Sequence, residues 1–122
     1  MTDEVDLFVY GSLMDEGILS SLTGRHFPRR EAELFGFERI TPKNGYPYII
    51  PKGEARVQGF LLWGIAPSTL AILDDYEEEG RLYHRRRVEV FVANRRISCE
   101  TYIGDIAALT AYFYDPSQTS KR

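Results

Sequence analysis

VDLFVYGSL, residues 5–13, is the stretch from which the fold can be predicted first. Residues 5–10 form a short apolar run of types that favour strands. Gly11 ends this run, and Ser12 is a residue type that often caps a helix, here ahead of residues 13–22. The stretch therefore predicts a strand, a tight turn and a helix at the start of a folded domain.

The rest of the chain interleaves strands and helices unevenly. Strands are predicted at 31–40 with a bulge at Gly36, at 48–50 and 55–65 on either side of a turn, and in a hairpin of 82–92 and 96–103. Residues 69–78 are a predicted second helix, and 106–114 fit either a strand or a short helix. The pattern favours an α+β fold, a small mixed β-barrel-like sheet flanked by two or so helices. We expect one domain, residues 1–122, with 116–122 as a flexible tail.

The bulk composition limits the partners. The chain has 122 residues, a net charge of -3 and a pI of about 5.4, so nucleic acid or an anionic membrane would gain little long-range attraction. Neither a basic signal peptide nor a run of roughly 18 apolar residues stands out. Cys99 is the one cysteine, and no Cys/His cluster predicts a metal site. We expect a cytoplasmic protein without metal or cofactor, a monomer or a weak homo-oligomer.

Acidic residues crowd the end of the predicted helix 69–78, and helical geometry separates one of them from the others. At about 100° per residue, Glu77 falls between Leu70 and Leu73 on the apolar side. The remaining carboxylates are expected to be surface groups: Asp74, Asp75, Glu78 and Glu79. A carboxylate held against apolar side chains loses hydration, which raises its pKa toward the range useful for proton transfer. Glu77 is therefore the candidate acid/base residue.

Two other interpretations of Glu77 stay open at this point. The carboxylate could pair with Arg85 of the following strand, or the helix could end early and leave Glu77 in solvent. The first interpretation would make Glu77 a structural residue, and the second would remove the apolar environment that raises its pKa.

The turn at residues 10–13 is the second candidate. Backbone N–H groups between a strand and a helix start can converge on an anion, and Gly11 allows close approach. Ser12 lacks the surroundings of a nucleophile, and Cys99 is more simply a buried thiol. The run 85–87 does not predict a nucleic-acid patch, because strand alternation sends Arg86 to the face opposite its two neighbours.

These segments together match a known pattern, a first strand ending in Tyr-Gly-Ser/Thr-Leu and a Leu-Asp-x-x-Glu helix followed by Tyr-x-Arg. In this chain they are Val9-Tyr10-Gly11-Ser12-Leu13, Leu73-Asp74-Asp75-Tyr76-Glu77 and Tyr83-His84-Arg85. Weaker matches are Gly45-Tyr46-Pro47, residues 57–61 and Tyr102. In these features the chain resembles the gamma-glutamylcyclotransferase-like family.

The resemblance implies a small mixed barrel and release of 5-oxoproline from gamma-glutamyl amines or peptides. It places Glu77 as the general acid/base residue and needs no metal or cofactor. It assigns substrate binding to the following residues: Tyr10, Gly11, Ser12, Leu13, Tyr83, Arg85 and Tyr102. Ser12-Leu13 lacks the asparagine that some members insert between these positions, so the chain looks more like the gamma-glutamylamine cyclotransferase branch than like enzymes acting on glutathione.

Two other kinds of function compete with the enzyme. A non-catalytic binding module could use the same pocket to hold a small carboxylate metabolite. An interaction protein could use its aromatic C-terminal segment. Because a binding module needs no poised acid/base residue, the presence of Glu77 favours the enzyme.

Overall fold

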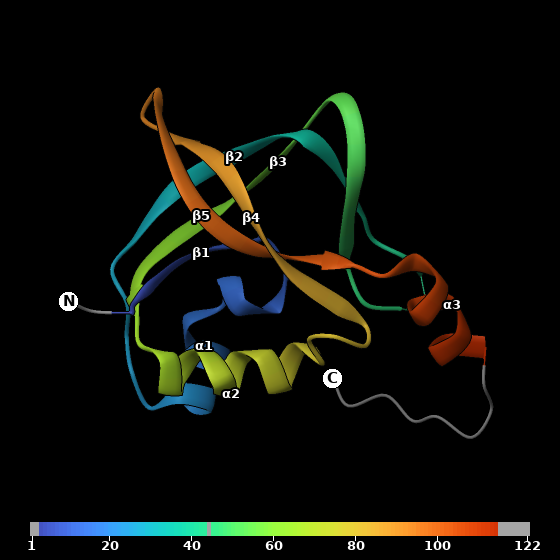
Figure 1. Cartoon of the computed structure of the whole chain (residues 1–122), viewed down its shortest axis with the longest axis horizontal. Coiled ribbons are helices and arrows are strands. Elements are labelled where there is room, and N and C mark those ends of the chain that lie inside the picture. The colour runs from blue at the N-terminus through green and yellow to red at the C-terminus, as the bar shows by residue number, and fades with distance from the viewer. Residues whose placement is uncertain (1–2, 44, 115–122) are drawn as a thin grey trace.

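The computed structural model describes residues 3–43 and 45–114 (Figure 1); the predicted tail 116–122 lies outside them. The strands are β1 (Val5–Val9), β2 (Arg29–Ile40), β3 (Tyr48–Ile65), β4 (Tyr83–Val92) and β5 (Arg95–Gly104). The helices are the short 3-10 helix η1 (Ser12–Met14) and the α-helices α1 (Glu16–Thr23), α2 (Pro67–Glu77) and α3 (Ile106–Tyr114).

The five strands close into a barrel in the order β1-β3-β2-β4-β5. Neighbouring strands are antiparallel except at the closure, where β1 and β5 run parallel. α1 and α2 lie together across one end of the barrel, and α3 lies to one side (Figure 1). The predicted α+β fold with a small mixed barrel is confirmed.

Strand β1 is buried on both faces, because its side chains alternate between two hydrophobic cores. Leu7 and Val9 belong to the core that includes the buried side chains of the helices, whereas Phe8 and Tyr10 belong to the core that includes buried residues of β2, β3 and β4. The alternation explains why the apolar run at residues 5–10 is nearly continuous. It also directs Tyr10, the last residue of the run, away from the helices.

The first predicted helix is divided in two. Residues 12–14 form η1, and α1 starts only at Glu16, because the Asp15 carboxylate accepts hydrogen bonds from the N–H groups of Gly17 and Ile18. Asp15, and not Ser12, is therefore the cap of the helix. This shift frees Ser12 for the turn that faces the candidate site.

The predicted break between residues 48–50 and 55–65 is wrong, since β3 runs through both. Pro51 pairs with Phe37 of β2 and Arg56 pairs with Phe35, so the ladder resumes after an irregularity opposite Gly36. Gly36 has φ +85°, so the predicted bulge is confirmed. A proline is tolerated at such an irregular position, where it removes no ladder hydrogen bond.

The later elements follow their sequence signals. Ala93 and Asn94 both have positive φ and connect β4 to β5 in a two-residue turn, so the predicted hairpin is confirmed. Residues 106–114 form a helix, the second of the two predicted possibilities. None of the helices in residues 3–43 and 45–114 has the length and hydropathy to span a membrane.

Candidate active site

A cavity of about 740 Å³ opens where the C-terminal end of β1 meets the end of α2. Its volume lies in the usual range for small-molecule sites, roughly 300–1,000 Å³. Among the described residues, those that line it are mostly aromatic or apolar: Phe8, Val9, Tyr10, Gly11, Ser12, Leu13, Arg39, Gly45, Tyr46, Pro47, Glu77, Tyr83, Tyr102 and Phe113. Seven of the eight residues predicted from the sequence are in this set.

Glu77 is the last residue of α2 and the only carboxylate among the described lining residues. Pro67 starts this helix at a position where its missing N–H costs nothing. Leu70 and Leu73 are buried on the face that carries Glu77, as the predicted angular position requires. Glu78 follows as the C-cap with a φ of +55°, so Glu77 stays within the helix, and it is half-buried.

The Tyr10–Leu13 turn forms the wall contributed by β1. The Tyr10 hydroxyl donates to the carbonyl oxygen of Tyr102 across the barrel closure. The hydroxyls of Ser12 and Tyr76 are 2.9 Å apart and hydrogen-bonded, which ties the turn to the residue preceding Glu77. A Cβ atom placed on Gly11 would have no heavy atom within 4 Å, so the space directly beside this residue is open to a ligand.

Two buried tyrosines complete the predicted set. The Tyr83 hydroxyl donates to the carbonyl oxygen of Pro47 at 2.6 Å, and the Tyr102 hydroxyl donates to the Asp74 carboxylate at 2.7 Å. Burial, and then the hydrogen bond to Asp74, raise the pKa of Tyr102. The phenol therefore keeps its hydrogen near neutral pH.

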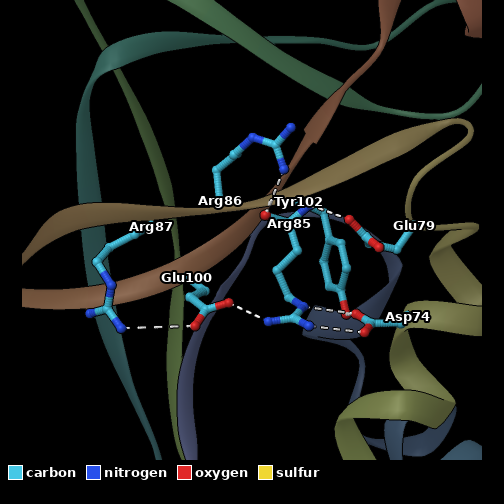
Figure 2. Close-up of polar contacts among 7 residues, drawn as sticks. All are labelled: Asp74, Glu79, Arg85, Arg86, Arg87, Glu100 and Tyr102. Atoms are coloured by element: carbon cyan, nitrogen blue, oxygen red, sulfur yellow. Dashed lines mark hydrogen bonds and ion pairs between the residues drawn. The ribbon is translucent and has the colours of Figure 1, made fainter.

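Arg85 does not line the cavity, although it is predicted as a substrate-binding residue. Its Nε and Nη2 donate to the two oxygens of Asp74 at 2.9 and 3.1 Å, and its Nη1 donates to Glu100. All three nitrogens of the guanidinium group therefore bind carboxylates other than that of Glu77. The interpretation of Asp74 as a surface carboxylate is also wrong, since this partly buried residue joins Arg85 to Tyr102 (Figure 2).

The cavity lining also includes residues that the sequence did not single out as a site. Tyr46 and Pro47 come from the loop before β3, and the rings of Tyr46 and Phe113 meet edge to face with centroids 4.7 Å apart. Arg39, an exposed residue of β2, is the only basic side chain among the described residues of the lining. The proline and glycine of the loop were visible in the sequence, but they did not indicate that the loop lines the same cavity as Glu77.

Among the described lining residues, the cavity thus presents one carboxylate, one guanidinium and the Ser12 hydroxyl beside apolar and phenolic side chains. Cys99 is buried in the barrel core and does not line it. Within residues 3–43 and 45–114, His, Cys, Asp and Glu side chains form no group of three that could hold a metal ion. The arrangement is suited to proton transfer by Glu77 on a small ligand held in this cavity.

Comparison with known proteins assigns the chain to a family. The sequence profile described as gamma-glutamyl cyclotransferase, AIG2-like, matches residues 7–119. AIG2-like protein C of Arabidopsis thaliana is 38% identical over 101 residues, which cover 80% of this chain and 58% of that protein. The chain belongs to the gamma-glutamyl cyclotransferase, AIG2-like family, and it spans less than two thirds of the length of this relative.

Solved structures agree with this assignment. A solution structure of an Arabidopsis thaliana protein superposes with a TM-score of 0.73 at 26% identity, covering 98% of this chain and 76% of that one. A structure titled gamma-glutamyl cyclotransferase superposes with a TM-score of 0.70 at 20% identity, covering 84% of this chain and 68% of that one. The second similarity is one of fold alone.

Proposed function

We propose that this chain is a gamma-glutamyl cyclotransferase that releases 5-oxoproline and a free amine, with Glu77 as its general acid/base residue. The observation that carries the proposal is that Glu77 shares a cavity with the Tyr10–Leu13 turn, although Glu77 lies 64 positions after Leu13 along the chain. Family membership supports this class of activity.

The nucleophile in this reaction belongs to the substrate. The Glu77 carboxylate takes a proton from the substrate's α-ammonium group, and the freed nitrogen attacks the γ-carbonyl carbon to close a five-membered ring. When the bond from that carbon to the leaving nitrogen breaks, Glu77 returns a proton to the leaving nitrogen. The second proton lost from the α-nitrogen passes to the released amine, which departs as an ammonium ion. The protein has to supply only positioning and one carboxyl group.

The substrate's α-carboxylate is best accommodated at the Tyr10–Leu13 turn. Met14 and Asp15 are the first residues whose N–H groups bond back within the turn, to the carbonyl oxygens of Gly11 and Ser12. The N–H groups of Ser12 and Leu13 precede these donors, so the turn itself offers them no acceptor. An anion held there by backbone N–H groups needs no basic side chain.

The leaving amine would then lie toward Arg39, Tyr46 and Phe113. Aromatic rings suit an apolar chain on the amine, and the guanidinium of Arg39 suits a carboxylate at its far end. A gamma-glutamyl amine or gamma-glutamyl amino acid fits these aromatic and basic side chains better than a purely polar substrate. The single buried cysteine is compatible with a cytoplasmic setting.

Incubation of the protein with a panel of gamma-glutamyl amines, amino acids and peptides tests the proposal, with 5-oxoproline and the released amine both measured by mass spectrometry. We expect equal amounts of the two products from at least one member of the panel. Binding of panel members without release of either product would support the binding module instead.

A further inference from the structure

Arg85 lies at the centre of a chain of polar contacts that reaches Tyr102, a residue of the cavity lining. Figure 2 shows its side chain beside the ring of Tyr102, with both groups ending at Asp74. Glu100 holds the remaining guanidinium nitrogen and is also 3.9 Å from the Nη2 of Arg87. Two carboxylates raise the pKa of Arg85, chiefly through the hydrogen bond to Asp74. Arg85 thus holds Asp74 and Glu100 and is not among the residues that line the cavity.

The contact with Asp74 decides which way the Tyr102 hydroxyl can bond. A phenol has one hydrogen to donate and lone pairs that accept, whereas a carboxylate paired with a guanidinium only accepts. The hydrogen of Tyr102 is donated to Asp74 at 2.7 Å. A ligand in the cavity that Tyr102 lines can therefore only donate to this oxygen.

The hydroxyl groups of the other two tyrosines of the predicted site also donate their hydrogens to protein oxygens. Tyr10 donates its hydrogen to the carbonyl oxygen of Tyr102, and Tyr83 donates to that of Pro47. Because these three phenols donate their hydrogens to the protein and Glu77 carries a carboxylate, the four side chains can offer a ligand only acceptor oxygens. An amino or ammonium group, which carries only donors in its charged form, matches such a lining.

We propose that Arg85 is a positioning residue, which through Asp74 fixes the Tyr102 hydroxyl as a hydrogen-bond acceptor for the amino group of the ligand. The inference rests on the proposed function, because it takes the ligand to be a gamma-glutamyl compound with a free α-amino group. It makes Tyr102 a residue that selects such ligands over otherwise identical ones that lack this group.

Two ligands that differ only in this group provide the test. Gamma-glutamyl-methylamide carries the α-amino group, and glutaric acid monomethylamide is the same molecule without it. Binding of each is measured by calorimetry in a protein with Glu77→Gln, in which the proposed reaction is blocked. We expect the amino ligand to bind at least about tenfold more tightly, as a hydrogen bond to a charged group implies.

Replacements in the contact chain should remove this preference. In the same background, Tyr102→Phe should weaken binding of the amino ligand about tenfold and change binding of its partner less than about twofold. Asp74→Ala should have the same selective effect, and it should add nothing once Tyr102→Phe is present. Arg85→Met should act in the same direction. Tyr102→Phe keeps the ring, so the test stands even if Asp74→Ala does not fold.

Two matched controls separate positioning from general damage. Arg87→Met removes the other arginine bound to Glu100, and Asp75→Ala removes an exposed carboxylate next to Asp74. Both should leave the preference unchanged. Equal weakening of both ligands by Tyr102→Phe, additive effects of the Asp74 and Tyr102 replacements, or no binding of the amino ligand would overturn the proposal.

Turnover by the protein with Glu77 intact distinguishes a failure of the proposed function from a failure of the positioning role. If that protein releases no 5-oxoproline but the preference and its dependence on Tyr102 are found, the proposed function fails and the positioning role stands. If 5-oxoproline is released but Tyr102→Phe leaves the preference intact, the positioning role fails and the proposed function stands.

Discussion

Replacement of Ser12 by alanine tests whether the Ser12 hydroxyl has a structural role or acts as a nucleophile. Its Oγ is 2.9 Å from the Tyr76 hydroxyl in a partly buried contact, and a neutral hydrogen bond of this kind contributes about 1 kcal/mol. For a domain of this size we expect Ser12→Ala to lower the melting temperature by about 4 °C. If the backbone of the turn holds the ligand, kcat/KM should fall less than about tenfold.

A double-mutant cycle with Tyr76→Phe assigns the stability loss to this contact. The coupling free energy between the two replacements should be about 1 kcal/mol, measured by urea unfolding of the four proteins. Ser21→Ala, an exposed serine of α1, is the matched control and should change neither the unfolding free energy nor kcat/KM. Complete loss of activity in Ser12→Ala, with a covalent adduct on Ser12 in the unsubstituted protein, would refute the reasoning and make Ser12 the nucleophile.

Three further predictions concern packing, charge and titration. Gly59→Ala should destabilise the fold by about 3 kcal/mol in urea unfolding, because its Cβ would lie 2.3 Å from a β1 carbonyl oxygen; Gly53→Ala, with open space around it, should be nearly neutral. Arg39→Gln should raise KM about tenfold for a gamma-glutamyl amino acid but not for the matching amine, whereas Arg95→Gln should affect neither. Burial raises the pKa of the Cys99 thiol from 9.0 to about 12, so as the pH rises the thiol ionises in the unfolded chain before it ionises in the folded one. The contribution of Cys99 to the free energy of unfolding is therefore full below pH 9 and is lost as the pH rises to 12. The fall in unfolding free energy from pH 9 to 11 should therefore be smaller in Cys99→Ala, and an equal fall would contradict this.

Local patterns in the sequence were sufficient for much of the fold. Period-two alternation identified the hairpin strands, Asn94 marked its turn, and helical geometry placed Glu77 on the face of Leu70 and Leu73. These features depend on neighbours within a few residues, which is why they can be read without knowing the tertiary structure. The turn signals around Pro51 failed because pairing with β2 overrides local propensity.

Contacts between distant elements could not be predicted in the same way. Asp74 and Arg85 lie on a helix and a strand, and their pairing depends on how α2 packs beneath the barrel. The position of Arg39 in the cavity lining depends equally on the closure of the barrel. The resemblance to a family grouped Arg85 with the site, and only the structure shows that its contacts lead to Tyr102 through Asp74.

The most direct test of the account compares 5-oxoproline release by the unsubstituted protein, Glu77→Gln and Asp75→Asn on the best substrate of the panel. Glutamine keeps the shape of the glutamate side chain and cannot transfer its proton, so we expect the rate to fall about 10²–10⁴-fold with ligand binding retained. Asp75→Asn changes an exposed carboxylate two residues away and should keep the full rate. A Glu77→Gln protein as active as the unsubstituted one would contradict the account.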